Sequence, residues 1–235
     1  MLNPNAVIPL YKQLMNKLKA EIASGVYKSG DKLLPEVEMA KQNNISVITV
    51  RRVINELTVL GFVEKKQGKG TFVAVKKYDR DYTQITGFSE ACKVMGLVPG
   101  SRLLESKLMV PSENILDSLK LPAESQTVYI SRLRYVNGEP MAIETSYFSL
   151  NYAFLLNETL EGSLFDVLKE KTNIRVAKSQ KMIEIYRANA QEAKYLGLRK
   201  NNPLLLVHST AYTEDGVPVY VCNQIINGER FKLMV

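Results

Sequence analysis

One segment, residues 46–61, strongly restricts how this chain can fold. Its apolar residues recur at helical spacing, so that Val50, Val53, Ile54 and Leu57 share one face. The opposite face and its flanks carry Ile48, Thr49, Arg51, Arg52 and Asn55. The segment therefore predicts an amphipathic helix that buries one side and presents cationic and polar groups on the other.

This helix is expected to be the third of a small helical unit. Residues 8–24 place leucine or isoleucine at every fourth position, and a shorter helix is predicted from about Pro35 to Asn43. Asn44 tolerates the left-handed conformation of a tight turn, and Ser46 is a good N-cap for the next helix. Two helices joined by a short turn, the second with a basic outer face, are typical of a helix-turn-helix that binds DNA.

A basic hairpin is predicted next. Residues 62–67 and 71–75 have the composition of strands, and the glycine turn 68–70 joins them, with Lys65 and Lys69 near its tip. Such a hairpin suits a wing placed on DNA phosphates or in the minor groove. Three helices and a basic hairpin in this order indicate a winged helix-turn-helix.

The distribution of charge agrees with this prediction. Residues 1–77 contain 13 Lys and Arg against 6 Asp and Glu, which accounts for the whole net charge of +7, whereas residues 78–235 contain 18 of each. An excess of positive charge confined to one module is the electrostatic pattern of a surface that meets phosphates. A basic but merely solvated surface is the alternative that charge alone leaves open.

The rest of the composition limits the cell compartment and the chemistry. No apolar run approaches the ~18 residues of a membrane span, so we expect a cytoplasmic protein with no membrane partner. Cys92 and Cys222 have no metal-ligand spacing and are expected to be free core thiols. We expect neither a metal nor a cofactor.

The remaining two thirds predict a second domain. The expected division is residues 1–75 for DNA binding, 76–83 for a charged linker and 84–235 for a domain that mixes helices and strands. Residues 119–144 are weakly repeated as 196–222. Two such units of helix end, strand, turn and strand predict one antiparallel sheet with helices on it, an α+β fold. Further segments are expected to be helical at 85–97 and 163–171, and extended at 128–135, 141–148 and 178–188.

Two arginines stand out in this repeat. Arg132 and Arg134 lie two positions apart and so project from one face of a predicted strand, whereas the second copy has Ser209 and Ala211 there. Two adjacent, partly buried arginines repel each other unless an anion compensates them. The alternative is a pair of surface arginines with carboxylate partners inside the protein.

The first third resembles the GntR family of bacterial regulators. The resemblance lies in PLYxQLxxxLxxxIxxG from Pro9, ISxxTVRRxIxEL (45–57) and GFVxxxxGKGTFV (61–73). It implies that the predicted helix 46–60 enters the major groove and that a homodimer binds a two-fold operator in double-stranded DNA. The residues that it places on DNA are Glu36, Ser46, Val47, Ile48, Thr49, Arg51, Arg52, Lys69 and Thr71.

Two departures from the family bear on its operator. Many relatives have arginine where this chain has Val37 and Val47, while Arg51 matches and Arg52 is additional. We expect Val47 and Ile48 to meet thymine methyl groups of an A·T-rich operator. Alternatively, Val47 packs inside the helix-turn-helix.

The second domain resembles the UTRA sensor of the HutC branch, which has a chorismate-lyase-like fold. The similar stretches include ITGFSE (85–90), SRLRYVNGEPMAIE (131–144) and GSLFDVL (162–168). The resemblance implies an effector site for a small anion such as a sugar phosphate. The residues that it implies are Thr86, Gly87, Phe88, Ser89, Arg132, Arg134, Glu144, Ser163, Phe165 and Tyr220. Phe165 replaces a tyrosine, and Tyr220 a glutamate, of some relatives.

One geometric condition applies to this site. A turn with two loop residues at Asn137-Gly138 would point Glu144 away from the arginines, whereas a three-residue loop or an equivalent bulge would place Glu144 across from Arg132. The direction of control also follows from the resemblance, which implies a repressor released by its effector.

An enzyme with a lyase-like fold is the main alternative function. The sequence supports it poorly, because the one histidine, His208, lies in an apolar run and is expected to be a strand residue. An architectural DNA-binding protein without a ligand is a third possibility, which the large, charge-neutral second domain disfavours. We therefore expect a regulator and no enzyme activity.

Overall fold

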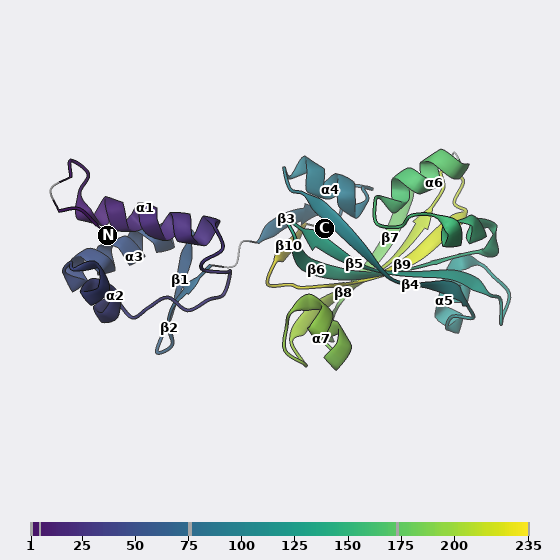
Figure 1. Cartoon of the computed structure of the whole chain (residues 1–235). Helices are drawn as coiled ribbons and strands as arrows, with labels where there is room; N and C mark the ends of the chain where they lie inside the picture. The colour runs from purple at the N-terminus through teal and green to yellow at the C-terminus, as the bar shows by residue number, and fades with distance from the viewer. Residues whose placement is uncertain (1, 5, 75–76, 173, 235) are drawn as a thin grey trace. The chain divides into compact units, whose positions relative to one another are not determined.

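The computed structural model describes the chain except residues 1, 5, 75, 76, 173 and 235, and it divides into two compact units (Figure 1). Unit one spans Met1–Lys77 and unit two spans Tyr78–Val235. Each unit has hydrophobic core clusters of its own.

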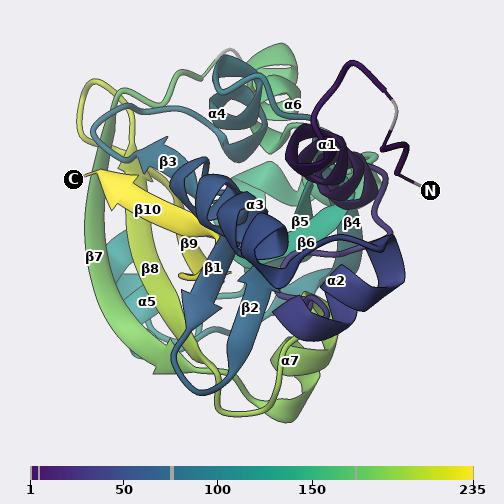
Figure 2. The same ribbon diagram turned by 90° about the vertical axis from the view of Figure 1, so that its left-hand side faces the viewer.

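Unit one contains the predicted three helices and hairpin (Figure 2). Its elements are α1 (Leu10–Ala23), α2 (Glu36–Asn43), α3 (Val47–Val59), β1 (Val63–Lys66) and β2 (Gly70–Val73). The apolar face predicted for the third helix is buried against α1, α2 and β1. Asn44 ends α2 in the left-handed conformation and so makes the tight turn possible.

Unit two is built on an antiparallel sheet of six strands in the order β4-β5-β6-β9-β8-β7. The strands are β4 (Pro99–Met109), β5 (Thr127–Val136), β6 (Glu139–Phe148), β7 (Lys178–Arg187), β8 (Pro203–Tyr212) and β9 (Pro218–Ile226). The helices are α4 (Phe88–Val94), α5 (Glu113–Leu119), the 3-10 segment η1 (Leu150–Asn157), α6 (Leu164–Thr172) and α7 (Ala190–Leu196). The α+β prediction is confirmed.

The internal repeat predicted from sequence is confirmed by this topology. β4, α5, β5 and β6 form one copy, and β7, α7, β8 and β9 form the other, so that β6 and β9 pair at the centre of the sheet. Each inner hairpin also has one irregularity in its register, which leaves Met141 or Val219 as the extra residue. The two copies therefore share even their local distortions.

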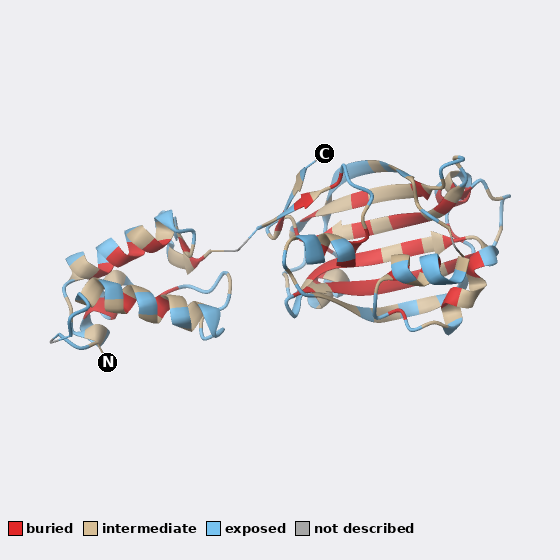
Figure 3. Ribbon diagram, turned by 90° about the horizontal axis from the view of Figure 1, so that it is seen from above, coloured by how far each residue is buried: buried red, intermediate tan, exposed pale blue. Residues whose placement is uncertain are grey.

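The sheet is covered on both faces (Figure 1). α4 and α6 lie over one face, and α5 and α7 over the other. Buried residues run along the central strands (Figure 3). The face beneath α4 and α6 holds the polar cavity described below.

The linker predicted over residues 76–83 is wrong for most of its length. Residues Tyr78–Asp81 form strand β3, which pairs in parallel with β10 (Phe231–Met234), and Tyr82 is buried. The charged composition predicted a solvent-exposed segment, but Arg80 and Tyr82 are buried, and both line the cavity together with Asp81. Residue 76 of the predicted linker lies outside the described residues.

Candidate DNA interface and effector cavity

The first turn of α3 is fixed by a cap. Ser46 Oγ accepts a hydrogen bond from the backbone N–H of Thr49 at 3.1 Å, as the N-cap prediction requires. Ile48, the second residue of the helix, is 79% exposed. Val47 packs partly against the core of unit one, which favours its structural role over a contact with bases.

A network of polar and charged side chains connects α2, α3 and the hairpin on the exposed face of unit one. Glu36 at the start of α2 accepts hydrogen bonds from Arg51 Nε at 3.0 Å and from Lys65 Nζ at 3.4 Å. Lys65 also donates to Asn55 Oδ1 at 2.9 Å. The network therefore connects α2, α3 and the hairpin, and it orients Arg51 without burying it.

The other predicted DNA contacts are also accessible, with different local partners. Arg52 pairs with Glu56 at 2.9 Å and lies over the ring of Tyr11. Lys69 is exposed in the hairpin turn, and Thr71 is half-buried on β2. The surface formed by α3 and the hairpin can thus present cations to a phosphate backbone.

All ten residues predicted for the effector site line one cavity in unit two. The space free of protein atoms in and around this cavity is about 730 Å³, a volume that includes open solvent at its mouth. The ten residues come from four places: the start of α4 (Thr86, Gly87, Phe88, Ser89), β5 and β6 (Arg132, Arg134, Glu144), the start of α6 (Ser163, Phe165) and β9 (Tyr220). The two helices over this face begin at the cavity, where their backbone N–H groups favour negative charge.

The geometric condition on Glu144 is met by a bulge. Asn137 and Gly138 form a two-residue turn with positive φ at both positions. The register then shifts at Met141, so Arg132 and Glu144 are direct partners on the same face. The turn alone would have separated them, and the extra residue in β6 brings them together.

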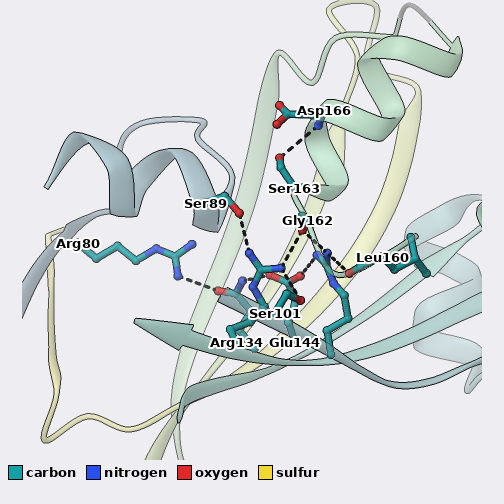
Figure 4. Close-up of polar contacts among 11 residues, drawn as sticks. Arg80, Ser89, Ser101, Arg134, Glu144, Leu160, Gly162, Ser163 and Asp166 are labelled. Atoms are coloured by element: carbon teal, nitrogen blue, oxygen red, sulfur yellow. Dashed lines mark hydrogen bonds and ion pairs between the residues drawn. The ribbon is translucent and has the colours of Figure 1, made fainter. Parts of the chain in front are cut away.

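The two arginines have different partners (Figure 4). Arg132 donates through Nη2 to Glu144 Oε1, and through Nη1 to the carbonyl oxygens of Leu160 and Gly162 at 3.3 and 3.2 Å. Arg134 donates to Ser89 Oγ at 2.9 Å and to Ser101 Oγ at 3.1 Å. Arg132 therefore has a carboxylate partner, whereas Arg134 is bound by neutral groups.

The buried charge of the cavity is unbalanced. Among the described residues, the buried ionised side chains are Arg80, Arg132, Arg134 and Glu144. Arg132 is 3% exposed and Arg134 1% exposed, and the Nε atoms of both are buried without a hydrogen-bond partner. The alternative of surface arginines is therefore wrong, because both lie inside unit two beside a cavity.

Burial and charge shift the pKa values in opposite directions here. Burial lowers the pKa of Arg134 to about 10, although Glu144 opposes this effect. Burial opposes ionisation of Glu144, but the charges of Arg132 and Arg134 and hydrogen bonds from Arg132 and Gln224 outweigh it, and its pKa falls to about 2. Glu144 is thus an ionised acceptor at neutral pH.

The sequence analysis missed three residues of this network. Gln224 donates to Glu144 Oε2 at 2.7 Å, and its own Oε1 accepts from Tyr82 at 3.0 Å and from Arg80 at 3.4 Å. Gln224 shares a strand face with Tyr220, a signal that alternation could have supplied. Arg80 and Tyr82 were not predicted to line the cavity, because their segment was predicted to be a linker.

Close packing shapes the roof of the cavity. A Cβ on Gly87 would lie 2.9 Å from Cδ2 of Phe165, so the start of α4 accommodates that ring only with glycine. Phe165 in turn meets the ring of Tyr220 edge-on at 6.1 Å. These contacts connect α4, α6 and β9 around the cavity.

Other expectations concern chemistry outside this network. His208 lies on β8 with Asn223 at 2.8 Å and Glu184 at 3.1 Å, which confirms a strand histidine. Cys92 and Cys222 are free and buried, as predicted. Within the described part of the chain, no cluster of His, Cys, Asp or Glu suits a metal, and no helix has the length and apolar character to cross a membrane.

Comparisons with known proteins agree with both units. Residues 10–73 match the family model described as bacterial regulatory proteins of the gntR family, and residues 94–232 match the UTRA domain. The chain is 32% identical over 231 residues to the HTH-type transcriptional repressor NagR of Bacillus subtilis, covering 98% of this chain and 95% of that protein. It is 23% identical over 213 residues to the HTH-type transcriptional regulator GmuR of the same organism, covering 88% and 90%.

The fold also has solved counterparts. The crystal structure of PhnF from Mycobacterium smegmatis matches with a TM-score of 0.68 at 24% identity, over 96% of this chain and 98% of that one. The matched families and relatives are transcription regulators and not enzymes. The chain therefore belongs to the gntR family of bacterial regulatory proteins, as a DNA-binding transcription regulator of the HutC type with a UTRA effector domain.

Proposed function

We propose that this chain is a cytoplasmic repressor that binds a two-fold operator as a homodimer and is released by a small anionic metabolite, such as a sugar phosphate. One observation carries the effector class: three buried arginines face one buried carboxylate around the cavity. Buried charges of one sign are costly unless a partner compensates them, and an anionic ligand is such a partner. The repressor named NagR is a relative over nearly the whole chain, which supports the direction of control.

The phosphate is expected at the end of the cavity beside Arg134. Ser89 and Ser163 lie there with the first backbone N–H groups of α4 and α6. Among the residues that the structure describes, no carboxylate forms an ion pair with Arg134, so its charge is available to the ligand. Glu144 keeps lone pairs beyond those used by Arg132 and Gln224, and it can accept from hydroxyl groups of a sugar.

Calorimetry on the full chain tests this assignment. Sugar phosphates are compared with the corresponding free sugars, for wild type and Arg134→Gln, with Arg102→Gln as the control because Arg102 is an exposed arginine on neighbouring β4. Loss of Arg134 is expected to weaken phosphate-dependent binding by about one to two orders of magnitude, since charge-assisted hydrogen bonds contribute about 1.5–3 kcal/mol each. Equal affinity for phosphorylated and free sugars would contradict the proposal.

A further inference from the structure

Two further cations line the cavity: Lys181, on a strand distant from Arg134, and Arg80, which lies between them and shares the ring of Phe88 with Arg134. Arg80 projects from β3 and is 7% exposed, and Lys181 projects from β7 and is half-buried. The cavity's ion pair among described residues joins Arg132 and Glu144, and it includes neither of them. Arg80 and Lys181 are thus cations whose surroundings supply little negative charge.

Aromatic and neutral groups surround both of them. The guanidinium of Arg80 lies 4.6 Å from the ring centroid of Tyr82 and 5.4 Å from that of Phe88. Lys181 Nζ donates to the backbone carbonyl of Tyr82 at 2.6 Å and lies 5.2 Å from its ring. Both cations therefore lie against Tyr82, and hydrogen bonds to the described residues use one donor of Arg80, to Gln224, and one of Lys181, out of the five and three that these groups have.

The internal repeat explains the position of Lys181. In the first copy, Arg132 on β5 is paired with Leu103 on β4. In the second copy, Ser209 replaces the arginine, and its partner on the outer strand β7 is Lys181. The cation of the first copy thus lies on the inner strand β5, whereas the cation of the second copy lies on the outer strand β7.

The positions of Arg134 on β5 and Lys181 on β7 set the distance between the two charged ends of the cavity. β5 and β7 are separated by β6, β9 and β8, so their backbones lie roughly four strand spacings, or ~19 Å, apart. The strands between them line the cavity with small side chains (Ser146, Cys222, Ser209 and Ala211) and with the larger Glu144, Tyr220 and Gln224. A ligand that reaches from Arg134 to Lys181 would therefore lie over these residues, with a cation near each end.

The charge balance points the same way. With Arg132 compensated by Glu144, the cavity retains Arg134, Arg80 and Lys181. A phosphate monoester carries about −1.5 to −2 and leaves part of this charge unmatched. Asp81 lies at the cavity too and offsets the charge of Lys181 in part, while its Oδ1 accepts from the backbone and side chain of Thr83.

The electrostatic surroundings of Lys181 would favour a bound anion. Burial and then the charge of Arg80 lower the pKa of Lys181, and Asp81 opposes them only in part. An acidic group between Arg80 and Lys181 would stabilise both cations.

We propose that Arg80 and Lys181 form a second acidic subsite, so that the effector is a sugar-sized phosphate ester bearing a carboxylate at the end opposite its phosphate. This inference rests on the proposed function and specifies the ligand of the same cavity. It predicts that the two acidic groups contribute separately to binding, one through Arg134 and the other through Lys181.

Matched ligand pairs test the second subsite by calorimetry on the full chain. Sorbitol 6-phosphate is compared with 6-phosphogluconate, and glycerol 3-phosphate with 3-phosphoglycerate, because the members of each pair differ by a carboxylate in place of a terminal hydroxymethyl group. We call the affinity of the carboxylate-bearing ester divided by that of its partner the affinity ratio. In at least one pair this ratio is expected to be about ten, equivalent to about 1.4 kcal/mol. Lys181→Gln should reduce the affinity ratio to within about twofold of one, and Arg80→Gln should lower it as well.

Two further variants separate charge from structure. Lys181→Arg keeps the charge and should keep the ratio. Lys178→Gln removes the same charge from the same strand, but Lys178 is exposed, lies outside the cavity lining and donates to the carbonyl of Glu214 at 3.3 Å, so the ratio should not change.

The outcomes distinguish this inference from the proposed function. A ratio near one in both pairs for wild type, or a ratio that survives in Lys181→Gln, overturns the second subsite while phosphate binding stands. If inorganic phosphate and all four esters fail to bind, the proposed phosphate effector is wrong and the inference falls with it.

Discussion

Glu144 lies directly opposite Arg132 in the register of β5 and β6, and its carboxylate accepts a hydrogen bond from Arg132 Nη2 inside the cavity. This pairing divides the roles of two arginines that look equivalent in the sequence. Arg132 is compensated within the protein, whereas Arg134 is left for a ligand. The cavity therefore combines a prebuilt ion pair with an available cation.

Removing the carboxylate should destabilise unit two. Glu144→Gln leaves Arg132 buried without a counter-charge, and breaking a buried ion pair in this way costs about 3–5 kcal/mol of unfolding free energy. Urea unfolding of wild type and variant measures the loss. Because an anion can replace the missing charge, added inorganic phosphate should stabilise Glu144→Gln more than wild type. An equal increase in the unfolding free energy of both proteins on adding phosphate would contradict this role.

The same pair predicts a dependence of stability on pH. The pKa of Glu144 is lowered from 4.5 to about 2 in the folded protein, so its stabilisation is complete above about pH 4.5 and declines as the pH falls toward 2. The difference in unfolding free energy between wild type and Glu144→Gln should decrease by about 2 kcal/mol from pH 6 to pH 3. A difference that stays constant over this range would mean that Glu144 is not held ionised by its partners.

The cations of unit one should control the salt dependence of DNA binding. Replacing Arg51, Arg52 and Lys69 with glutamine is expected to lower the slope of log affinity against log salt by about one unit per phosphate contact. The control replaces Arg102, Lys107 and Lys178, which are exposed residues of unit two. Fluorescence anisotropy over a salt series gives both slopes. An unchanged slope in a folded triple variant rules out these contacts.

Ile48 should recognise a thymine methyl group. Its side chain is exposed at the start of α3 and cannot donate to guanine, but it can pack against a methyl. Replacing the facing thymine with deoxyuridine should weaken binding about three- to fourfold, since one methyl group contributes about 0.8 kcal/mol. Ile48→Ser should abolish the difference, and Val59→Ser, at the far end of the same helix, should retain it. A half-site dominated by G·C at the positions facing Ile48 would exclude this recognition.

Ser46 has a structural role that can be separated from its predicted place on DNA. Ser46→Ala should cost about 1 kcal/mol because the cap on Thr49 is lost. Ser46→Asp keeps the cap and should retain stability, but its charge should weaken binding to phosphates. Chemical unfolding and DNA titration of both variants give the two effects independently. Equal DNA affinity of Ser46→Asp and wild type would place Ser46 away from the backbone.

Local pattern was sufficient for most elements of the fold. The spacing of Val50, Val53, Ile54 and Leu57 predicted α3 and its buried face, because a helix repeats its faces regardless of what it packs against. Asn137-Gly138 likewise predicted a hairpin, since few other residues adopt positive φ at both positions. The internal repeat predicted the paired halves of the sheet.

Tertiary structure decided which residues meet. Alternation along a strand says which residues share a face, but a one-residue bulge at Met141 reverses that relation for everything beyond it, and no local signal marked the bulge. Val47 was ambiguous for a related reason, because the packing of neighbouring elements determines how far a first-turn side chain is buried.

The sequence by itself thus predicted most of the elements and the repeat, and its resemblance to a known family supplied ten of the residues that line the cavity, whereas long-range pairing determined the completed charge network. Arg80 belongs to a charged segment that only the parallel pairing of β3 with β10, near the far end of the chain, converts into a strand. Lys181 lines the cavity only because the sheet order sets β7 at its outer edge beside β8. Such contacts depend on which strands become neighbours, and hydrophobic burial over the whole domain, rather than any local propensity, selects that arrangement.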